Sequence, residues 1–158
     1  MLTEEGPRVV EFNCRFGDPE TQVVLPLLES SLLEPLLEIA RGGRLGGSSF
    51  EWSSGAALTT VLASEGYPGV YAKGLPIHIP ESVTTNPDIL LFHAGTTPAP
   101  EGLETSGGRV IAVTGLGTTL TQAASTSLEA ATAIEFSGKQ FRKDIGWREF
   151  ARADPGPR

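Results

Sequence analysis

Three polar residues near the start of the chain, Glu11, Asn13 and Arg15, alternate with apolar ones. If this stretch is a β-strand, alternate side chains share one face, so the three would lie together. A carboxylate and an amide oxygen are hard ligands of the kind that hold Mg²⁺, with phosphate oxygens filling its remaining positions. Arg15 would add a guanidinium suited to a phosphate or a carboxylate. The pattern fits a metal–nucleotide site, although the solvated face of an ordinary strand would alternate in the same way.

Local signals indicate how the chain would position these residues. Gly6-Pro7 forms a turn, and the alternation over residues 8–16 predicts a strand. Gly17 ends that strand. Asp18 suits the N-cap of a helix and Pro19 its first position, so we expect a helix to begin here.

A second helix is predicted further along. Pro26 interrupts the first helix, and Ser31 and Glu34 have the spacing of a capping box. We therefore expect a helix over about residues 32–41. The glycine-rich and serine-rich stretch over residues 42–54 marks a change of organisation and carries the candidate domain boundary.

The remainder of the chain, residues 45–158, has the pattern of short strands separated by turns. The spacing of Thr119 and Gln122 before an alanine-rich segment predicts one helix packed on this sheet. Near the end, we expect a Lys143–Asp144 ion pair and Trp147 to dock the tail. The expected strands cover residues 56–63, 76–79, 89–95 and 108–115.

Composition narrows the class of protein. The chain has 158 residues, of which 39% are hydrophobic and 20% charged, which is typical of a folded protein with one core or two small ones. The net charge of -7 disfavours nucleic acids and anionic membranes as partners. The longest apolar run, near residues 23–28, is too short to span a bilayer. A single cysteine fits a reducing, cytoplasmic location.

Longer motifs carry a family resemblance. Glu-x-Asn-x-Arg on a strand resembles the Mg-ATP ligand motif of the ATP-grasp superfamily. The continuation Phe16-Gly17-Asp18-Pro19-Glu20-Thr21-Gln22 is similar to the phosphoribosylamine–glycine ligase (glycinamide ribonucleotide synthetase) family, and argues against other ATP-grasp ligases or carboxylases. Later blocks resemble the same family, in order and over almost the whole chain: Ala63-Ser64-Glu65-Gly66-Tyr67-Pro68-Gly69, Phe92-His93-Ala94-Gly95-Thr96, Gly107-Gly108-Arg109-Val110 and Phe141-Arg142-Lys143-Asp144-Ile145-Gly146-Trp147-Arg148.

The resemblance implies an α+β fold in two parts. Residues 1–44 would be the C-terminal part of an ATP-grasp domain, with a strand and helices. Residues 45–158 would be the glycinamide ribonucleotide synthetase C-terminal domain, a small β-rich unit with one packed helix.

The resemblance also implies an ATP-dependent carbon–nitrogen ligase of purine biosynthesis. ATP would activate the carboxylate of glycine as glycyl phosphate, and the amine of 5-phosphoribosylamine would attack it to give glycinamide ribonucleotide, ADP and phosphate. Glu11 and Asn13 would bind Mg²⁺ or Mn²⁺. Arg15 and Asp18 would act as catalytic residues near the nucleotide phosphates or the other substrates, and Arg15 would also contact the nucleotide.

A complete enzyme of this family is much longer, so its N-terminal part would be the missing partner. The chain by itself would then be inactive. Whether it is a truncated chain, the product of a mis-started gene or one piece of a split enzyme stays open. The alternative is a non-catalytic interaction module that docks on a partner carrying the rest of the ATP site, with exposed apolar surface on four leucines: Leu25, Leu28, Leu32 and Leu36.

Other residues have ordinary interpretations. Phe12, Cys14 and Phe16 would share the packing face of the first strand, so we expect Cys14 to be a buried, inert thiol. His93 is expected to be a structural, hydrogen-bonded histidine. Residues 107–109, Gly-Gly-Arg, could form a turn with positive φ or a cradle for a phosphate, and both interpretations stay open.

Overall fold

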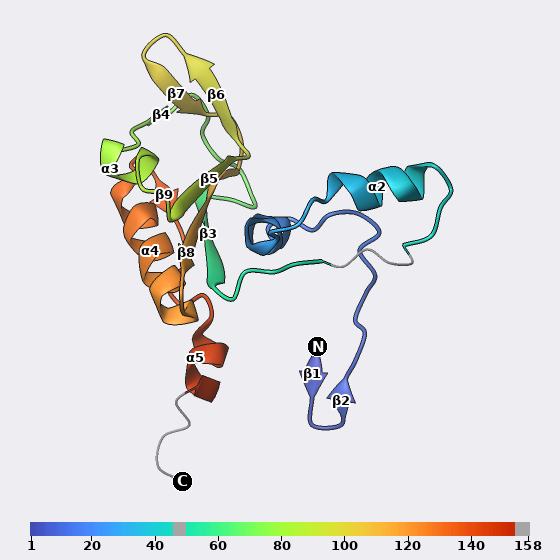
Figure 1. The fold of residues 1–158 in the computed structure, drawn as a ribbon. Coiled ribbons are helices and arrows are strands. Elements are labelled where there is room, and N and C mark those ends of the chain that lie inside the picture. Colours follow the sequence, from blue (N-terminus) through green and yellow to red (C-terminus); the bar gives the residue numbers. More distant parts are fainter. Residues whose placement is uncertain (46–49, 154–158) are drawn as a thin grey trace.

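The computed structural model describes residues 1–45 and 50–153. It confirms the predicted α+β class: a sheet-and-helix body is built from the later part of the chain, and the earlier part runs alongside it (Figure 1). Within these described residues, no helix has both the length and the apolar character needed to cross a membrane. The boundary predicted between residues 44 and 45 stays a prediction, and residues 46–49, which follow it, lie outside the described part.

The main sheet is antiparallel and has the strand order β5-β8-β3-β9. Its two long central strands are β3 (Ala56–Ser64) and β8 (Arg109–Gly117), flanked by β5 (Ile89–His93) and β9 (Lys139–Gln140). A β-bulge interrupts the register of β3 and β8 at the end where Ala63 faces Arg109. Three predicted strands are thereby confirmed, with ends that differ by one or two residues.

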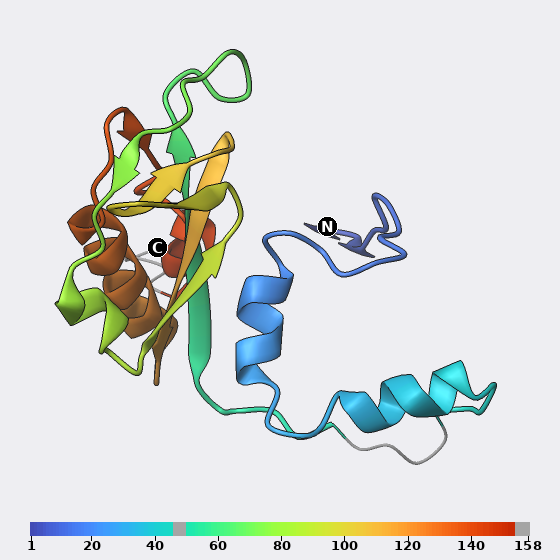
Figure 2. The same cartoon turned by 90° about the horizontal axis from the view of Figure 1, so that it is seen from above.

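Helix α4 (Leu120–Ala133) covers one face of this sheet (Figure 2). The backbone N–H of Gln122 donates to the side chain of Thr119 at 3.2 Å, so the predicted N-cap is confirmed. The core lies between α4 and the sheet and is mainly aliphatic. Its fully buried large members are Leu62, Val110, Ile111, Val113 and Ile134.

A second, smaller sheet has the order β4-β7-β6. It comprises β4 (Pro76–Ile77), β7 (Gly102–Thr105) and β6 (Thr96–Ala99), and the short helix α3 (Glu81–Thr84) follows β4. The β6–β7 hairpin was not predicted, because four-residue strands that contain proline or glycine give almost no alternating signal.

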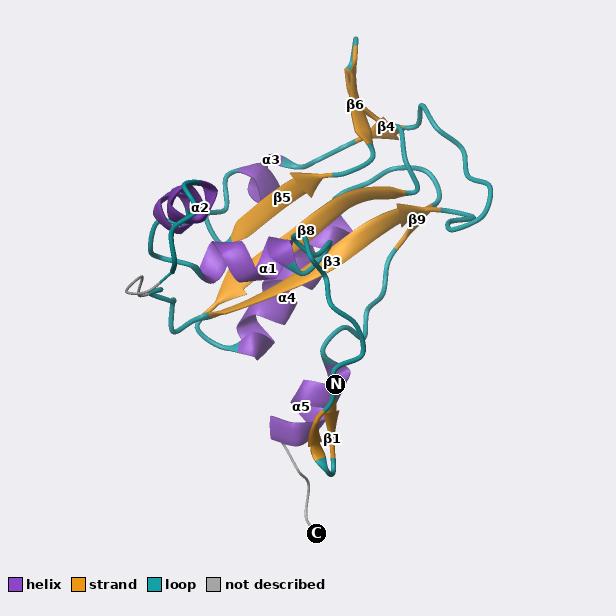
Figure 3. Cartoon of the chain, turned by 90° about the vertical axis from the view of Figure 1, so that its right-hand side faces the viewer, coloured by secondary structure: helices purple, strands orange, loops and turns teal. Residues whose placement is uncertain are grey.

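Helix α1 (Thr21–Val24) lies on the face of the main sheet opposite α4 (Figures 2 and 3). A 3₁₀ turn, η1 (Leu25–Leu27), continues it at Pro26, so the predicted interruption is confirmed. Helix α2 (Leu33–Ala40) confirms the helix predicted over 32–41. Its predicted capping box is wrong, because Leu32 is the N-cap and makes no side-chain cap hydrogen bond.

The strand predicted over residues 8–16 is wrong. A short hairpin of β1 (Leu2–Thr3) and β2 (Gly6–Pro7) precedes it, so the turn predicted at Gly6-Pro7 is wrong and lies instead at residues 4–5. Residues 8–16 then run as an exposed, irregular segment. In the part of the chain that the structure describes, no strand pairs with this segment. Because a strand exists through hydrogen bonds to a neighbouring strand, alternation by itself cannot form one.

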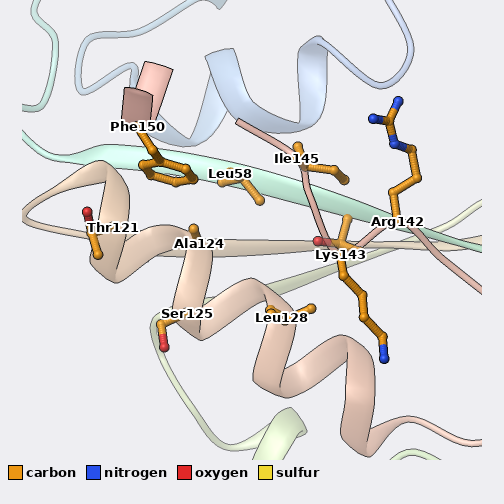
Figure 4. Close-up of a pocket in the computed structure, with 10 residues that line it drawn as sticks. Leu58, Thr121, Ala124, Ser125, Leu128, Arg142, Lys143, Ile145 and Phe150 are labelled. Atoms are coloured by element: carbon orange, nitrogen blue, oxygen red, sulfur yellow. The ribbon is translucent and has the colours of Figure 1, made fainter. Parts of the chain in front are cut away.

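The end of the described chain is helix α5 (Trp147–Ala153), which was not predicted. Ile145 and Phe150 line a cavity with Leu58 of β3 and Leu128 of α4 (Figure 4). Trp147 is 53% exposed, so the predicted aromatic anchor is wrong. The tail docks through an aliphatic and a phenyl side chain instead.

Candidate functional site

The three residues proposed as a metal–nucleotide site, Glu11, Asn13 and Arg15, are all exposed on the irregular segment. Arg15 Nη1 donates to the carbonyl oxygen of Phe16 at 2.9 Å. Over residues 1–45 and 50–153, no group of three or more His, Cys, Asp or Glu side chains is arranged to hold a metal ion. Glu11 and Asn13 carry a carboxylate and an amide, whose oxygens are of the kind that Mg²⁺ takes as ligands.

The expected packing face of this segment is not buried. Phe12 is 83% exposed and Phe16 is 60% exposed. Cys14 is an exposed free thiol, so the prediction of a buried one is wrong. The reason is the same as for the strand: without a neighbouring strand or helix, neither face of the segment is covered.

Asp18 is held by two partners. Arg109 Nη2 donates to Asp18 Oδ2 at 2.6 Å, and Arg109 Nη1 lies 3.4 Å from the Asp18 carbonyl oxygen. Gln22 Nε2 donates to the other carboxylate oxygen, Oδ1, at 2.9 Å. Asp18 is therefore not the N-cap that the sequence predicted, because its carboxylate is engaged elsewhere. The helix begins at Thr21 and its N-cap is Glu20.

The start of helix α1, directly after the Asp18 turn, provides a second attachment to β8. Thr114 Oγ1 donates to the carbonyl oxygen of Gln22 at 3.0 Å and lies 2.9 Å from the hydroxyl of Thr59 on β3. Gln22 Oε1 is buried and has no hydrogen-bond partner among the described atoms. The orientation of the Gln22 amide is fixed because the Asp18 carboxylate can only accept, so Nε2 must face it.

The glycines before Arg109 allow close backbone approach. A Cβ on Gly95 would lie 2.7 Å from Gly107 Cα, and one on Gly108 would overlap the ring of Tyr67. Neither Gly107 nor Gly108 is among the glycines with positive φ, so of the two interpretations left open, the positive-φ turn is wrong. Both carbonyl groups are occupied: Ser64 donates its hydroxyl to Gly107 O at 3.1 Å and its N–H to Gly108 O at 2.8 Å.

His93 ends β5 and is exposed, and its Nδ1 lies 3.0 Å from the hydroxyl of Thr96. This contact agrees with the expectation of a hydrogen-bonded histidine. Asp144, expected to pair with Lys143, pairs with Arg142 instead at 2.8 Å. The hydrogen bond from Arg142 and its charge lower the pKa of the Asp144 carboxyl.

An open cleft of about 510 Å³ lies between α1 and the β3 side of the sheet. Its walls are mostly apolar, with Glu20 and Arg142 as the charged members. The cleft begins directly after Asp18, because Pro19 lines it. Along the chain, Asp18 therefore lies between the exposed Glu11–Arg15 segment and the residues near α1 that line this cleft.

Sequence reasoning missed the contact between Asp18 and Arg109. Both residues stood in motifs that the sequence singled out, but 91 positions separate them. No local pattern pairs residues so far apart in one sequence. The available signal was that the motifs containing Asp18 and Arg109 follow the order seen in the family. That order does not show which residues lie close together in the folded chain.

Comparisons with known proteins support the resemblance. Residues 57–148 match the family model described as phosphoribosylglycinamide synthetase, C domain. A phosphoribosylamine–glycine ligase of Rhizobium meliloti is 46% identical over 153 residues, which cover 96% of this chain and 35% of that protein. The crystal structure of the Thermotoga maritima phosphoribosylamine–glycine ligase matches with a TM-score of 0.76 at 37% identity, covering 91% of this chain and 34% of that one.

A more distant likeness concerns the fold alone. The biotin carboxylase domain of a Hydrogenobacter thermophilus 2-oxoglutarate carboxylase has a TM-score of 0.65 at 16% identity, and the match covers 98% of this chain and 37% of that one. The chain spans about a third of the length of the bacterial phosphoribosylamine–glycine ligases it matches, such as those of Rhizobium meliloti and Chlorobaculum tepidum. Since the family model covers more than half of its residues, the chain belongs to the phosphoribosylglycinamide synthetase (phosphoribosylamine–glycine ligase) family and contains its C domain.

Proposed function

We propose that this chain is the C-terminal third of an ATP-dependent phosphoribosylamine–glycine ligase. The reaction joins glycine to 5-phosphoribosylamine and gives glycinamide ribonucleotide, ADP and phosphate. The observation that carries the proposal is the extent of the similarity. It spans 96% of the chain at 46% identity, and therefore includes the Glu11–Asp18 segment as well as the C domain.

In this proposal Glu11 and Asn13 hold Mg²⁺ or Mn²⁺ together with the phosphates of ATP. Their oxygens are suitable donors, and their exposure leaves them accessible to a nucleotide. When bound, the metal neutralises the charge of the phosphates during phosphoryl transfer. Arg15 places its guanidinium beside the transferred phosphoryl group, where a fixed positive charge stabilises the developing negative charge.

Asp18 joins this segment to the C domain through its contact with Arg109. Its carboxylate already accepts hydrogen bonds from Arg109 and Gln22, which fix its orientation. A carboxylate held in this way is suited to receive an amine or a hydroxyl of the glycine or phosphoribosyl substrate. In this proposal Asp18 is therefore a catalytic residue that contacts a substrate.

The N-terminal part of the enzyme is the partner that completes the ATP site, in the cytoplasm. On this chain, the surface that binds the N-terminal part would include α2. There Leu33 is 64% exposed, Leu36 44% and Ile39 51%. Such a row of exposed aliphatic side chains on one helix is typical of a contact surface. With a net charge of -7, neither a nucleic acid nor an anionic membrane is a suitable partner.

The alternative is a non-catalytic interaction module. Its expectation of exposed leucines is met at Leu25 and Leu36, whereas Leu28 and Leu32 are half-buried. Both functions use the same apolar surface, so exposure does not separate them. Activity after assembly separates the two functions. An interaction module would bind its partner, but no product would form that depends on Glu11.

The deciding experiment measures glycinamide ribonucleotide formed from ATP, glycine and 5-phosphoribosylamine. We expect no product above a no-protein control with the chain alone. We expect product from the assembled enzyme, that is, this chain together with the N-terminal two thirds of the ligase, joined or supplied as a separate chain. Product from the chain alone would contradict its need for the N-terminal part. Assembly that binds but forms no product would favour the interaction module.

A further inference from the structure

We infer that Arg109 is a positioning residue, which acts through Asp18 to hold the segment that carries Glu11, Asn13 and Arg15. The inference rests on the proposed function, since it assigns this segment to the metal–nucleotide site. It adds a residue from the C domain to the machinery of the site. Arg109 itself would contact neither metal nor substrate.

The backbone on both sides of Arg109 is closely packed and hydrogen-bonded. Arg109 is the first residue of β8 and faces Ala63 of β3 next to the β-bulge. Directly before it, Gly107 packs against Gly95, and Ser64 hydrogen-bonds the carbonyl groups of residues 107 and 108. Because this backbone is closely packed, the Arg109 guanidinium has a defined position from which to hold the Asp18 carboxylate.

The stretch over residues 18–22, made of the turn at Asp18 and the start of α1, is attached to β8 at both ends. Arg109 holds Asp18, and the hydroxyl of Thr114, five residues further along β8, holds the carbonyl oxygen of Gln22. Gln22 also donates to Asp18, so the two attachments are joined into one network. The turn therefore moves with the sheet of the C domain.

The segment before the turn has no such support. Among the described residues, residues 8–16 pair with no strand, and all of them are exposed. Arg15 is three residues before Asp18, so the two Cα atoms lie within about 10 Å of each other along the chain. Asp18 is thus the fixed point nearest to the proposed metal and phosphate contacts.

The ion pair itself is poorly placed to stabilise the whole fold. The side chains of Arg109 and Asp18 are 39% and 48% exposed, and exposed ion pairs contribute little to global stability. Its loss should therefore change the position of the segment more than the melting temperature. This separates a positioning role from a merely structural one.

The first test uses the isolated chain and trypsin, with cleavage followed by mass spectrometry. In Arg109→Gln, release of the Asp18 turn should raise the cleavage rate after Arg15 by roughly threefold or more, because trypsin needs a locally free backbone. Cleavage after Arg8, ten residues before Asp18, should not change. Arg109→Lys, which keeps the charge, should restore part of the protection. Arg152→Gln removes another exposed, ion-paired arginine and is the matched control.

The second test uses the assembled enzyme. Arg109→Gln should lower kcat/KM by about tenfold, because a misplaced site loses rate steeply, while the melting temperature stays within about 2 °C of the wild type. In the isolated chain, Asp18→Asn should also raise the cleavage rate after Arg15, and adding Arg109→Gln should raise it no further, since Arg109 acts through that carboxylate. Additive increases in cleavage, or equal cleavage after Arg15 in all variants, would overturn the inference. A wild-type assembly without product would instead defeat the proposed function, and the trypsin result would still decide the role of Arg109.

Discussion

The hydroxyl groups of Thr60 on β3 and Ser127 on α4 lie 2.7 Å apart in the buried core. Ser127 also donates to the carbonyl oxygen of Val113 on β8 at 2.8 Å. Because a serine hydroxyl has one proton, Thr60 must donate to Ser127. A single serine thus joins the helix to both central strands of the sheet.

We predict that Ser127→Ala destabilises the chain by about 1–3 kcal/mol, since it leaves the buried Thr60 hydroxyl without an acceptor. Urea unfolding measures the change. The double variant Thr60→Val, Ser127→Ala should recover part of the loss, because both polar groups are then removed. Ser125→Ala, on the exposed side of α4, is the control. Equal stability of the Ser125 and Ser127 variants would contradict this account of the core.

Much of this part of the fold could be predicted from sequence, for a physical reason. The capping spacing of Thr119 and Gln122 and the mainly apolar, β-branched runs of β3 and β8 between turn residues are local signals, and the local structure follows them. Residues 8–16 show the limit of the same reasoning. Their side chains alternate between polar and apolar, yet a strand also needs a neighbouring strand, and a sequence pattern does not show whether one is present.

Lys139 provides a second test of the helix. Its Nζ donates to the carbonyl oxygens of Ala131 and Thr132, both at 2.9 Å, and to that of Ile134. These carbonyls lie at the C-terminal end of α4, where a positive charge is favourable. Lys139→Met should therefore destabilise the chain by about 1–2 kcal/mol.

The control for Lys139 is Lys73→Met, which removes an exposed ammonium that lies 5.9 Å from the ring centre of Tyr71. Burial lowers the pKa of Lys139, and the charge of Glu135 opposes this lowering. The pKa of Lys139 in the folded chain lies below its ordinary value of 10.5. Burial of the charged ammonium therefore costs stability at pH values below the folded pKa, and this cost is relieved as the pH rises from the folded pKa to 10.5. The loss of folding stability in Lys139→Met should be measured by urea unfolding at neutral pH. If it is no larger than the loss in Lys73→Met, Lys139 does not cap α4.

Asp144 gives a prediction about pH. The hydrogen bond from Arg142 holds the pKa of Asp144 below its ordinary value of 3.8. The pair therefore stabilises the tail above that value, and its contribution is lost as the pH falls through the lowered pKa. In a carbon-13 NMR titration, Arg142→Gln should move the midpoint of Asp144 upward. A midpoint that stays in place would show that Arg142 does not cause the shift.

The apolar side of α2 gives a prediction about assembly. Leu36→Glu should leave the stability of the isolated chain within about 0.5 kcal/mol of the wild type, because this side chain is already exposed. It should weaken binding to a separately supplied N-terminal part by about tenfold or more, measured by calorimetry, because a charge would be buried in the contact. Glu38→Gln, on the same helix, is the control. Unchanged binding by the Leu36 variant would remove α2 from the docking surface.

The contacts of the candidate site could be predicted only in part. Residue types identified Glu11, Asn13, Arg15 and Asp18 as candidates, because oxygen ligands and guanidinium groups have a definite chemistry. Their surroundings did not follow from the sequence. The partner of Asp18 comes from β8, and its position depends on a bulge and on glycine contacts that belong to the folded chain.

The most direct test of the proposed function is a metal titration of the assembled enzyme. With Glu11→Ala, the Mg²⁺ concentration that gives half-maximal formation of glycinamide ribonucleotide should rise by about tenfold, and the maximal rate should fall, because one of the two metal ligands proposed for this chain is lost. Glu5→Ala, an exposed carboxylate of the N-terminal hairpin, should titrate like the wild type. A metal titration of Glu11→Ala that coincides with that of the wild type would contradict the assignment of this segment as the metal site.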